Sequence, residues 1–346
     1  MPHQIQLPGK ILIGNGKIKT LPEVCSDLGV IGKEGKVLII TDENVLKLTG
    51  NKIKEILSGH KAETAIIKGA TVSEARRIVS EFNDINCIVA TGGGTVNDIG
   101  KYVAFEKKLP LISVPTALSH DGLASENVSL WDNNGKLSMP AKPPTVIIAD
   151  IDILKSSPYR LMAAGCADLI SNYTAIYDWK LAKRAKREHY SESSAKLAIY
   201  SAEAVVKSAK SIKNREEEGV KTLVKALVSS GVAMSLVGSS RPASGSEHKF
   251  SHALDSLGSK ALHGEQCGLG AILMACHQGQ NWQKIKSSLK SVGAPTTAKE
   301  IGIEEEMIIQ ALLKATSMND RYTILEHKPL DNIKAMELCV TTGMFQ

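Results

Sequence analysis

The sequence predicts an α/β fold in two domains: an N-terminal parallel-sheet domain, residues 1–155, and a C-terminal all-helical domain, residues 156–346. In the first part, six short runs of apolar and β-branched residues alternate with stretches of helical periodicity. Beyond residue 157 such runs are scarce, and Ala, Leu, Lys and Ser recur at helical intervals instead. A chain of 346 residues is long enough for two domains of the usual ~100–200 residues.

The apolar runs are continuous rather than alternating, which is typical of strands in a parallel sheet covered by helices on both faces. The helical crossovers between the runs make the domain Rossmann-like. Thr71 and Glu74 form a capping-box pattern at the start of one crossover. The strands are expected at 10–13, 37–41, 64–67, 87–90, 111–114 and 146–149, and the helices at 44–57, 73–82 and 96–105.

The boundary between the domains is expected near residues 152–158. The last strand ends there in acidic residues, and Ser-Ser-Pro follows, with Pro158 suited to the first turn of a helix. Two-domain enzymes commonly bind their ligands between the domains. We therefore expect the active site in the cleft between the two domains.

The composition excludes several classes of protein. Hydrophobic residues make up 43% of the chain and charged residues 23%, which is typical of a folded globular protein rather than a disordered one. Four Phe, three Trp and seven Tyr are too few for a surface that stacks single-stranded nucleic acid. The net charge of +6 suits a small anionic substrate better than a polyanion.

The six cysteines lie far apart without a Cys-x-x-Cys pair, so we expect buried thiols in a reducing compartment. The first residues lack the basic and apolar segments of a secretory signal, and no run reaches the ~18 apolar residues of a membrane span. A cytoplasmic protein without membrane insertion is expected.

A glycine-rich segment, Thr-Gly-Gly-Gly-Thr-Val-Asn-Asp at 91–98, follows the strand 87–90 and leads into a helix. Glycines let the backbone approach a ligand closely and adopt positive φ, while the free N–H groups at a helix N-terminus attract an anion. The segment predicts a site for the diphosphate of a dinucleotide. It matches neither G-x-G-x-x-G nor a P-loop, and a tight turn without a ligand is the alternative.

Two other strand ends carry polar side chains. Asp42 follows the strand 37–41, where a carboxylate can accept hydrogen bonds from the ribose of the dinucleotide or can cap the next helix. The ribose interpretation favours NAD, since the carboxylate would repel the 2′-phosphate of NADP. The segment 114–125 is rich in hydroxyl, carboxylate and glycine positions, and we expect it to line the cleft.

Histidine and aspartate residues of the second half form a candidate metal site. His248 and His252 are four residues apart, on one face of a helix, and His263 and Asp168 supply further ligand types. Zinc and iron(II) both accept such nitrogen and oxygen donors, and three protein ligands leave a position for a substrate oxygen. Histidines on the surface or in the core are the alternative.

These motifs together resemble the superfamily of iron-dependent alcohol dehydrogenases, glycerol dehydrogenases and dehydroquinate synthases. The glycine segment continues as Gly-Gly-Gly-Thr-Val-Asn-Asp-Ile-Gly-Lys at 92–101, and Asp168 and the three histidines follow in the order typical of the superfamily. Within it, the Ser-His-Asp-Gly-x-Ala-Ser stretch at 119–125 is similar to that of the archaeal sn-glycerol-1-phosphate dehydrogenase family. The resemblance extends over residues 7–327.

The resemblance implies a cofactor, NAD or NADP, and one zinc ion per subunit, which iron(II) can replace. The implied ligands of the metal are Asp168, His248 and His263, and the implied substrate contacts are Asp121, Asp168 and His252. Arg321 is a further candidate, for the substrate phosphate, because a guanidinium fork suits phosphate; a structural ion pair is the alternative. The implied dinucleotide contacts are Gly94, Thr95, Val96, Asn97 and Asp98 at the diphosphate, and Thr116, Ser119 and Ser125 toward the nicotinamide.

The activity that the resemblance implies is reduction of dihydroxyacetone phosphate to sn-glycerol 1-phosphate, the glycerophosphate backbone of archaeal ether phospholipids. Our hypothesis is that the metal polarises the C2 carbonyl for hydride transfer. A water chain near His252 or Asp121 would then carry the proton. A homo-oligomer is expected.

Three alternatives remain at this point. A polyol dehydrogenase would prefer unphosphorylated glycerol. A sugar-phosphate cyclase like dehydroquinate synthase would consume no net NADH. A non-catalytic dinucleotide-binding module would bind cofactor without metal.

Overall fold

The computed structural model describes residues 5–30, 35–132, 135–318 and 321–345. The chain forms two compact units. The first comprises Met1–Leu118 and Gly122–Pro158, and the second comprises Ser119–Asp121 and Tyr159–Gln346. The main boundary between the units therefore follows Pro158. The short segment Ser119–Asp121 belongs with the second unit, although it precedes this boundary. Among the described residues, no helix combines the length and apolar character that crossing a bilayer requires.

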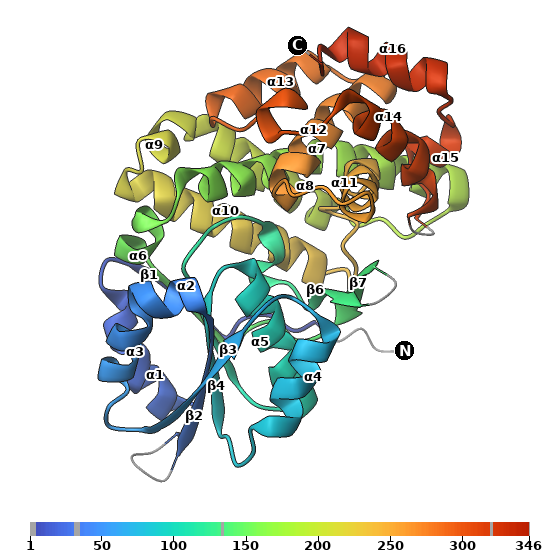
Figure 1. Ribbon diagram of the computed structural model, residues 1–346. Coiled ribbons are helices and arrows are strands. Elements are labelled where there is room, and N and C mark those ends of the chain that lie inside the picture. The colour runs from blue at the N-terminus through green and yellow to red at the C-terminus, as the bar shows by residue number, and fades with distance from the viewer. Residues whose placement is uncertain (1–4, 31–34, 133–134, 319–320, 346) are drawn as a thin grey trace. The chain divides into compact units, whose positions relative to one another are not determined.

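The first unit is built on a six-stranded sheet in which every strand pairs in parallel with its neighbours (Figure 1). The strand order is β1-β8-β5-β4-β2-β3. The prediction of a parallel sheet with helical crossovers is confirmed, and each predicted strand lies within an observed one. The strands are β1 (Lys10–Gly14), β2 (Lys36–Asp42), β3 (Lys61–Ile67), β4 (Cys87–Gly92), β5 (Leu111–Pro115) and β8 (Val146–Asp150).

Alternate side chains of the central strands β2, β4 and β5 enter two separate cores, because successive residues of a strand point to opposite faces of the sheet. Leu38 and Ile40 of β2 pack in one core with residues of α4 (Val72–Glu81) and α5 (Gly94–Lys107). Val37 and Ile39 pack in the other with residues of α1 (Leu21–Asp27) and α3 (Asn51–Ile56). Both faces are therefore buried, which explains the continuous apolar runs. Other short helices are η1 (Lys17–Thr20), η3 (Asp121–Ala124) and α6 (Ile151–Ser156).

The single helix predicted over 44–57 is wrong. The chain forms α2 (Glu43–Val45), a π-helical turn (Leu46–Gly50) and then α3. Within the turn, the Thr49 hydroxyl donates to the Val45 carbonyl at 3.1 Å, which competes with regular helical bonding. Thr49 and the glycine after it also have low helix propensity, which favours an interruption of the helix here. The amphipathic pattern nevertheless continues across the interruption.

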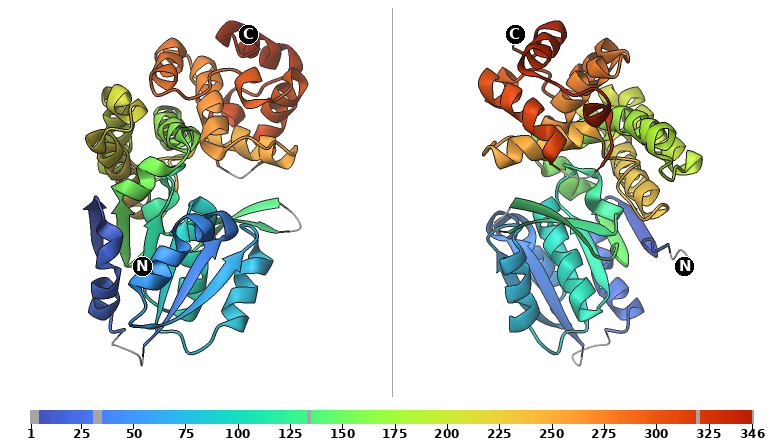
Figure 2. Two further views of the ribbon diagram at one scale, coloured as in Figure 1. Left: turned by 60° about the vertical axis from the view of Figure 1, so that its left-hand side comes forward. Right: turned by 90° about the vertical axis from the view of Figure 1, so that its right-hand side faces the viewer.

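A two-stranded antiparallel hairpin, β6 (Asn127–Asp132) and β7 (Gly135–Pro140), was not predicted. Val128 and Leu130 of β6 join the core that α4 and α5 form on the sheet. Figure 2 shows the hairpin beside these helices in both views. Only β6 has a buried face, so the alternation of buried and less buried residues is short. The sequence pattern therefore gives only a weak indication of this hairpin.

The described part of the second unit is helical, which confirms the predicted all-helical half. Its centre is α7 (Tyr159–Lys186), most of whose residues between 162 and 182 are buried. The other helices are α8 (Glu192–Lys207), α9 (Ala209–Lys213), α10 (Glu217–Ser235), α11 (Ser246–Ser256), α12 (His263–His277), α13 (Trp282–Ser291), η4 (Lys299–Ile301), α14 (Glu305–Lys314), η5 (Ala315–Ser317), α15 (Ile324–His327) and α16 (Asn332–Thr342).

Candidate metal centre and dinucleotide loop

Three helices of the second unit bring four potential metal ligands together. Asp168 lies on α7, His248 on α11, and His263 and Cys267 on α12, and their ligand atoms all lie within 4.8 Å of one another. Glycine makes this approach possible, since a Cβ on Gly264 would lie 2.0 Å from the carbonyl oxygen of Ala164 on α7. The predicted trio therefore converges, with a cysteine that the sequence did not single out.

The distances within the cluster fit a shared cation better than direct hydrogen bonds. The Nε2 atoms of His248 and His263 lie 3.7 and 3.8 Å from Oδ1 of Asp168, beyond hydrogen-bond range. Ligands that bind one zinc ion at ~2.0–2.2 Å can be separated by up to about 4.2 Å. Oδ1 of Asp168 is buried and has no hydrogen-bond partner in the described part of the chain. The donor set and this unsatisfied oxygen fit a divalent cation.

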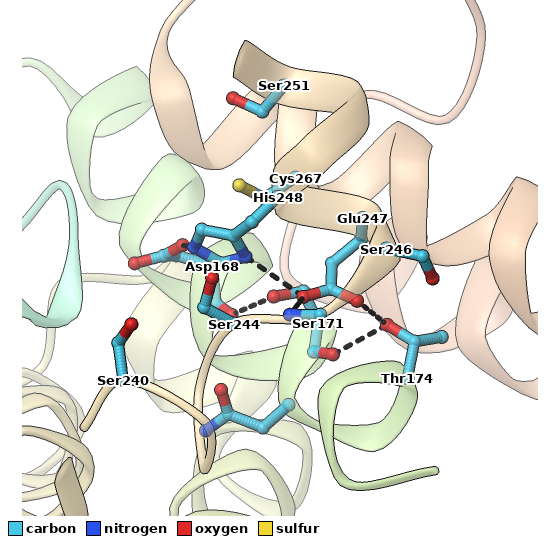
Figure 3. Close-up of polar contacts among 12 residues, drawn as sticks. Asp168, Ser171, Thr174, Ser240, Ser244, Ser246, Glu247, His248, Ser251 and Cys267 are labelled. Carbon is cyan, nitrogen blue, oxygen red and sulfur yellow. Dashed lines mark hydrogen bonds and ion pairs between the residues drawn. The ribbon is translucent and has the colours of Figure 1, made fainter. Parts of the chain in front are cut away.

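Hydrogen bonds to both histidines leave the correct nitrogen of each ring for a metal. Glu247 Oε1 lies 3.0 Å from Nδ1 of His248, and a carboxylate oxygen requires Nδ1 to be the donor (Figure 3). Ser251 donates its hydroxyl proton to Gln266 at 2.7 Å, so at 3.1 Å it accepts from Nδ1 of His263. With both protons on Nδ1, each Nε2 presents its lone pair to the cluster, as metal-binding histidines require.

The electrostatics of Asp168 also favour a cation. Burial, together with the nearby Asp121 carboxylate, raises the pKa of Asp168 to about 7. The backbone N–H of Asp121 donates to Oδ2 of Asp168 at 2.9 Å, and Ser230 donates to the Asp121 carboxylate at 2.7 Å. A charged carboxylate that is buried beside a second carboxylate is energetically unfavourable, and a bound divalent ion stabilises it.

Two other predicted residues of the second unit, His252 and Arg321, lie outside the donor cluster. The His252 ring is 6.2 Å from the His263 ring, centroid to centroid. Arg321 donates to the Ser244 carbonyl at 3.0 Å and to the Ser240 hydroxyl at 2.7 Å. Burial, reinforced by Arg241, lowers the pKa of Arg321 to about 10. Substrate contact by His252 and phosphate binding by Arg321 stay predictions.

The glycine segment of the first unit connects β4 to α5, as predicted, but the expected positive φ is wrong. Gly93 has a φ of −76°, and neither of its glycine neighbours has positive φ. The need for glycine is steric instead, since a Cβ on Gly92 would lie 2.4 Å from Cγ2 of Val96. A Cβ on Gly93 would meet no atom within 4 Å, so the space beside it is open.

This segment lies at the switch point of the sheet, where β2 leads to β3 on one side and β4 leads to β5 on the other. Ile40 pairs in register with Ala90, so Asp42 and Gly92, two residues later on each strand, end at the same edge. Dinucleotides bind open α/β sheets at such points. Asp42 caps α2 by accepting from the Val45 N–H at 2.9 Å, which confirms its capping role, while ribose binding stays a prediction.

Asn97 and Asp98 support the loop from within the protein. The Asn97 amide donates to the carbonyls of Gly92 and Gly93 at 3.1 and 3.0 Å and accepts from Ser113 at 2.5 Å. Asp98 accepts from the backbone of β6 and pairs with a fully buried lysine on α5. The backbone N–H groups at the start of α5, those of Gly94, Thr95 and Val96, have no carbonyl within the helix to bind. Direct cofactor contact is therefore expected from these N–H groups rather than from the side chain of Asn97.

The three hydroxyl residues predicted toward the nicotinamide lie after β5. The backbone N–H of Thr116 donates to the Gly92 carbonyl at 3.0 Å, which ties this segment to the glycine loop. The Ser125 hydroxyl donates to the Asn127 carbonyl at 3.2 Å. Ser119 belongs to the short segment of the second unit. A role for each of them at the cofactor stays a prediction.

Sequence reasoning missed Glu247 and Cys267. Glu247 is adjacent to His248 and was not distinguished from the rest of the helix, because its partner Thr174 is far away in the sequence and donates to it at 2.8 Å. Cys267 follows His263 by four residues, the spacing that was used for His248 and His252. That spacing was the available signal for Cys267.

We expect Glu247→Ala to weaken zinc binding by about 10–100-fold, the usual effect of losing a hydrogen-bond partner of a metal ligand. The substitution frees the Nδ1 proton of His248 and also the Gly245 N–H, which donates to Glu247 at 2.5 Å. Glu247→Gln keeps an oxygen for both donors and should retain most of the affinity. Competition with a chromophoric zinc chelator measures both variants, and equal losses in the two would contradict a positioning role.

The fold and the cluster of metal donors together indicate which class of proteins this one resembles. The sequence signature of the family described as iron-containing alcohol dehydrogenase matches residues 12–158. The solved structure of glycerol dehydrogenase from Schizosaccharomyces pombe has a TM-score of 0.79 at 18% identity, covering 99% of this chain and 90% of that one. A probable glycerol dehydrogenase from Sinorhizobium meliloti 1021 has a TM-score of 0.80 at 17% identity, covering 99% and 98%. The protein therefore has the glycerol dehydrogenase-like fold.

Sequence relatives narrow the class to one family. Glycerol-1-phosphate dehydrogenase (NAD(P)+) of Methanothermobacter thermautotrophicus is 45% identical, with 99% of each chain covered. The enzyme of the same name from Thermococcus kodakarensis is 45% identical over 99% of this chain and 98% of its own. The chain belongs to the glycerol-1-phosphate dehydrogenase family.

Proposed function

We propose that this protein catalyses the NAD(P)H-dependent reduction of dihydroxyacetone phosphate to sn-glycerol 1-phosphate. The observation that carries the proposal is the 45% identity to glycerol-1-phosphate dehydrogenases over 99% of the chain. The cluster of Asp168, His248 and His263 supports it, because this reduction needs an electrophile at the ketone oxygen and the cluster is fit to hold one.

The residues of the chain would divide the work as follows. Asp168, His248 and His263 would hold a divalent cation, zinc or iron(II), which supplies Lewis-acid polarisation of the substrate carbonyl. Glu247 and Ser251 keep the two imidazoles in the required tautomer and orientation. These supporting contacts are pre-formed, so little reorganisation is needed when ligands bind.

The first unit would bind the nicotinamide cofactor, which supplies the hydride. The N–H groups at the start of α5 would bind its diphosphate, with the open space beside Gly93 admitting the phosphates. Asp42 is proposed at the ribose, where its carboxylate would favour NAD over NADP. Asp121 and His252 are proposed as substrate contacts and as the route by which a proton reaches the product oxygen.

The product would enter phospholipid synthesis as the glycerophosphate backbone of archaeal ether lipids. We propose that the enzyme works in the cytoplasm, which agrees with six cysteines that form no disulfide in the structure. We also propose a homo-oligomer. Size-exclusion chromatography with light scattering tests the oligomeric state.

The decisive assay follows NADH oxidation with dihydroxyacetone phosphate, before and after removal of metal by a chelator, and then determines the chirality of the product. We expect turnover that disappears with the chelator, returns with zinc and yields the sn-1 product. Glycerol and NAD are tested in parallel, because two similar solved structures are a glycerol dehydrogenase and a probable glycerol dehydrogenase. A preference for glycerol would overturn the proposed substrate, and turnover in metal-free protein would overturn the role of the metal.

A further inference from the structure

Cys267 lies inside the donor cluster rather than beside it. Its side chain is fully buried, and it is one helical turn after His263 on α12. The sulfur is 3.5 Å from Nε2 of His263 and 3.9 Å from Nδ1, so it is closer to the nitrogen that faces Asp168. Figure 3 shows the sulfur next to His248.

The sulfur also lies close to the other two donors. Its position and the ligand atoms of His248 and Asp168 are all within 4.8 Å of one another. A ligand sulfur at ~2.3 Å and a ligand nitrogen at ~2.1 Å from one zinc ion can be up to about 4.4 Å apart, and the 3.5 Å separation from His263 satisfies this limit. The position of the sulfur is therefore compatible with the same cation.

A second observation points to a ligand at this place. Oδ1 of Asp168 is buried, has no hydrogen-bond partner among the described residues and belongs to the same cluster as the sulfur. An unsatisfied carboxylate oxygen in the protein interior is costly unless a ligand compensates it. The two imidazole Nε2 atoms and this oxygen surround the space that the sulfur adjoins.

We infer that Cys267 is a fourth protein ligand, as a thiolate, of the divalent cation held by Asp168, His248 and His263. This inference rests on the metal site of the proposed function. When the cation binds, the Cys267 S–H bond breaks, the proton passes to solvent and the sulfur lone pair forms the bond to the metal. A thiolate favours zinc and cobalt over manganese, which prefers oxygen donors.

Cobalt(II) gives a direct test, since bonding of a thiolate to cobalt produces an intense charge-transfer absorption in the near ultraviolet that nitrogen and oxygen ligands do not. The metal-free protein is titrated with Co²⁺ as wild type, Cys267→Val and Cys267→Ser. Cys276→Ala is the matched control, because Cys276 is on the same helix but outside the cluster. We expect the near-ultraviolet band in the wild type and the control, and its loss in both Cys267 variants.

Metal affinity gives a second readout that a purely structural role would not move. We expect Cys267→Val to weaken zinc binding by more than the ~10–100-fold typical of an outer-shell substitution, while manganese binding changes far less. Stoichiometric cobalt binding without the charge-transfer band would overturn the inference and leave the three-ligand site standing. Failure of the wild type to bind cobalt or zinc at all would overturn both the inference and the metal site of the proposed function.

Discussion

Replacing His248 with alanine is expected to lower kcat/KM for reduction of dihydroxyacetone phosphate by at least ~10³-fold, because polarisation of a carbonyl by a metal contributes several kcal/mol and each ~1.4 kcal/mol is a factor of ten. The substitution removes the Nε2 atom of His248, which lies 3.7 Å from Oδ1 of Asp168 and would bind the same cation. Zinc content after dialysis should fall together with activity. NADH affinity should remain, since the dinucleotide loop belongs to the other unit.

The matched control for this experiment is His189→Ala, because His189 is an exposed residue of the same unit and the bond that its backbone carbonyl accepts from Trp179 survives the substitution. It should retain activity, zinc content and thermal stability. Thermal unfolding followed by circular dichroism shows whether the His248 variant is folded. A folded His248→Ala protein that keeps near wild-type turnover without zinc would show that the metal centre is not catalytic.

The sequence predicts those features that depend on a local residue pattern, or on the rule that ligands of parallel sheets bind at the carboxyl ends of the strands. The six strands were found because each contains a run of apolar or β-branched residues, most of them buried in β2, β4, β5 and β8. The glycine segment at 91–98 was found because it joins a strand to a helix. Asp168, His248 and His263 could be grouped by ligand chemistry and by the family resemblance. The interrupted helix after β2 was missed because its hydrophobic period continues while the backbone does not.

The remaining features of the site depend on how helices are rotated and packed, which a single sequence does not express. The rotation of α5, for example, turns the Asn97 amide toward Ser113 on β5 and the loop carbonyls, contacts that the sequence did not predict, while its role at the cofactor stays a prediction. Glu247 becomes significant only because α7 places Thr174 opposite it. Such tertiary pairings determine which of several polar residues touch a ligand and which support it.

A carboxylate introduced into the glycine loop is expected to have opposite effects on folding and on cofactor binding. Gly93 is the N-cap of α5, has extended backbone geometry and has no side-chain cap. Aspartate is accommodated there, since a Cβ meets no atom within 4 Å, and it would cap the helix and stabilise the protein by a few tenths to ~1 kcal/mol. The same negative charge would occupy the position proposed for the diphosphate.

The expected result for Gly93→Asp is therefore a melting temperature at or above that of the wild type with NADH affinity reduced by about 10²-fold. Two unit charges ~4 Å apart near a protein surface repel by about 4 kcal/mol before salt screening, and 1.4 kcal/mol is a factor of ten in Kd. Fluorescence titration with NADH measures the affinity. Gly93→Asn is the matched control, because it can cap α5 without the charge and should lose much less affinity. Equal losses in the two variants would indicate steric exclusion rather than repulsion, and unchanged NADH affinity in Gly93→Asp would show that the loop is only a turn.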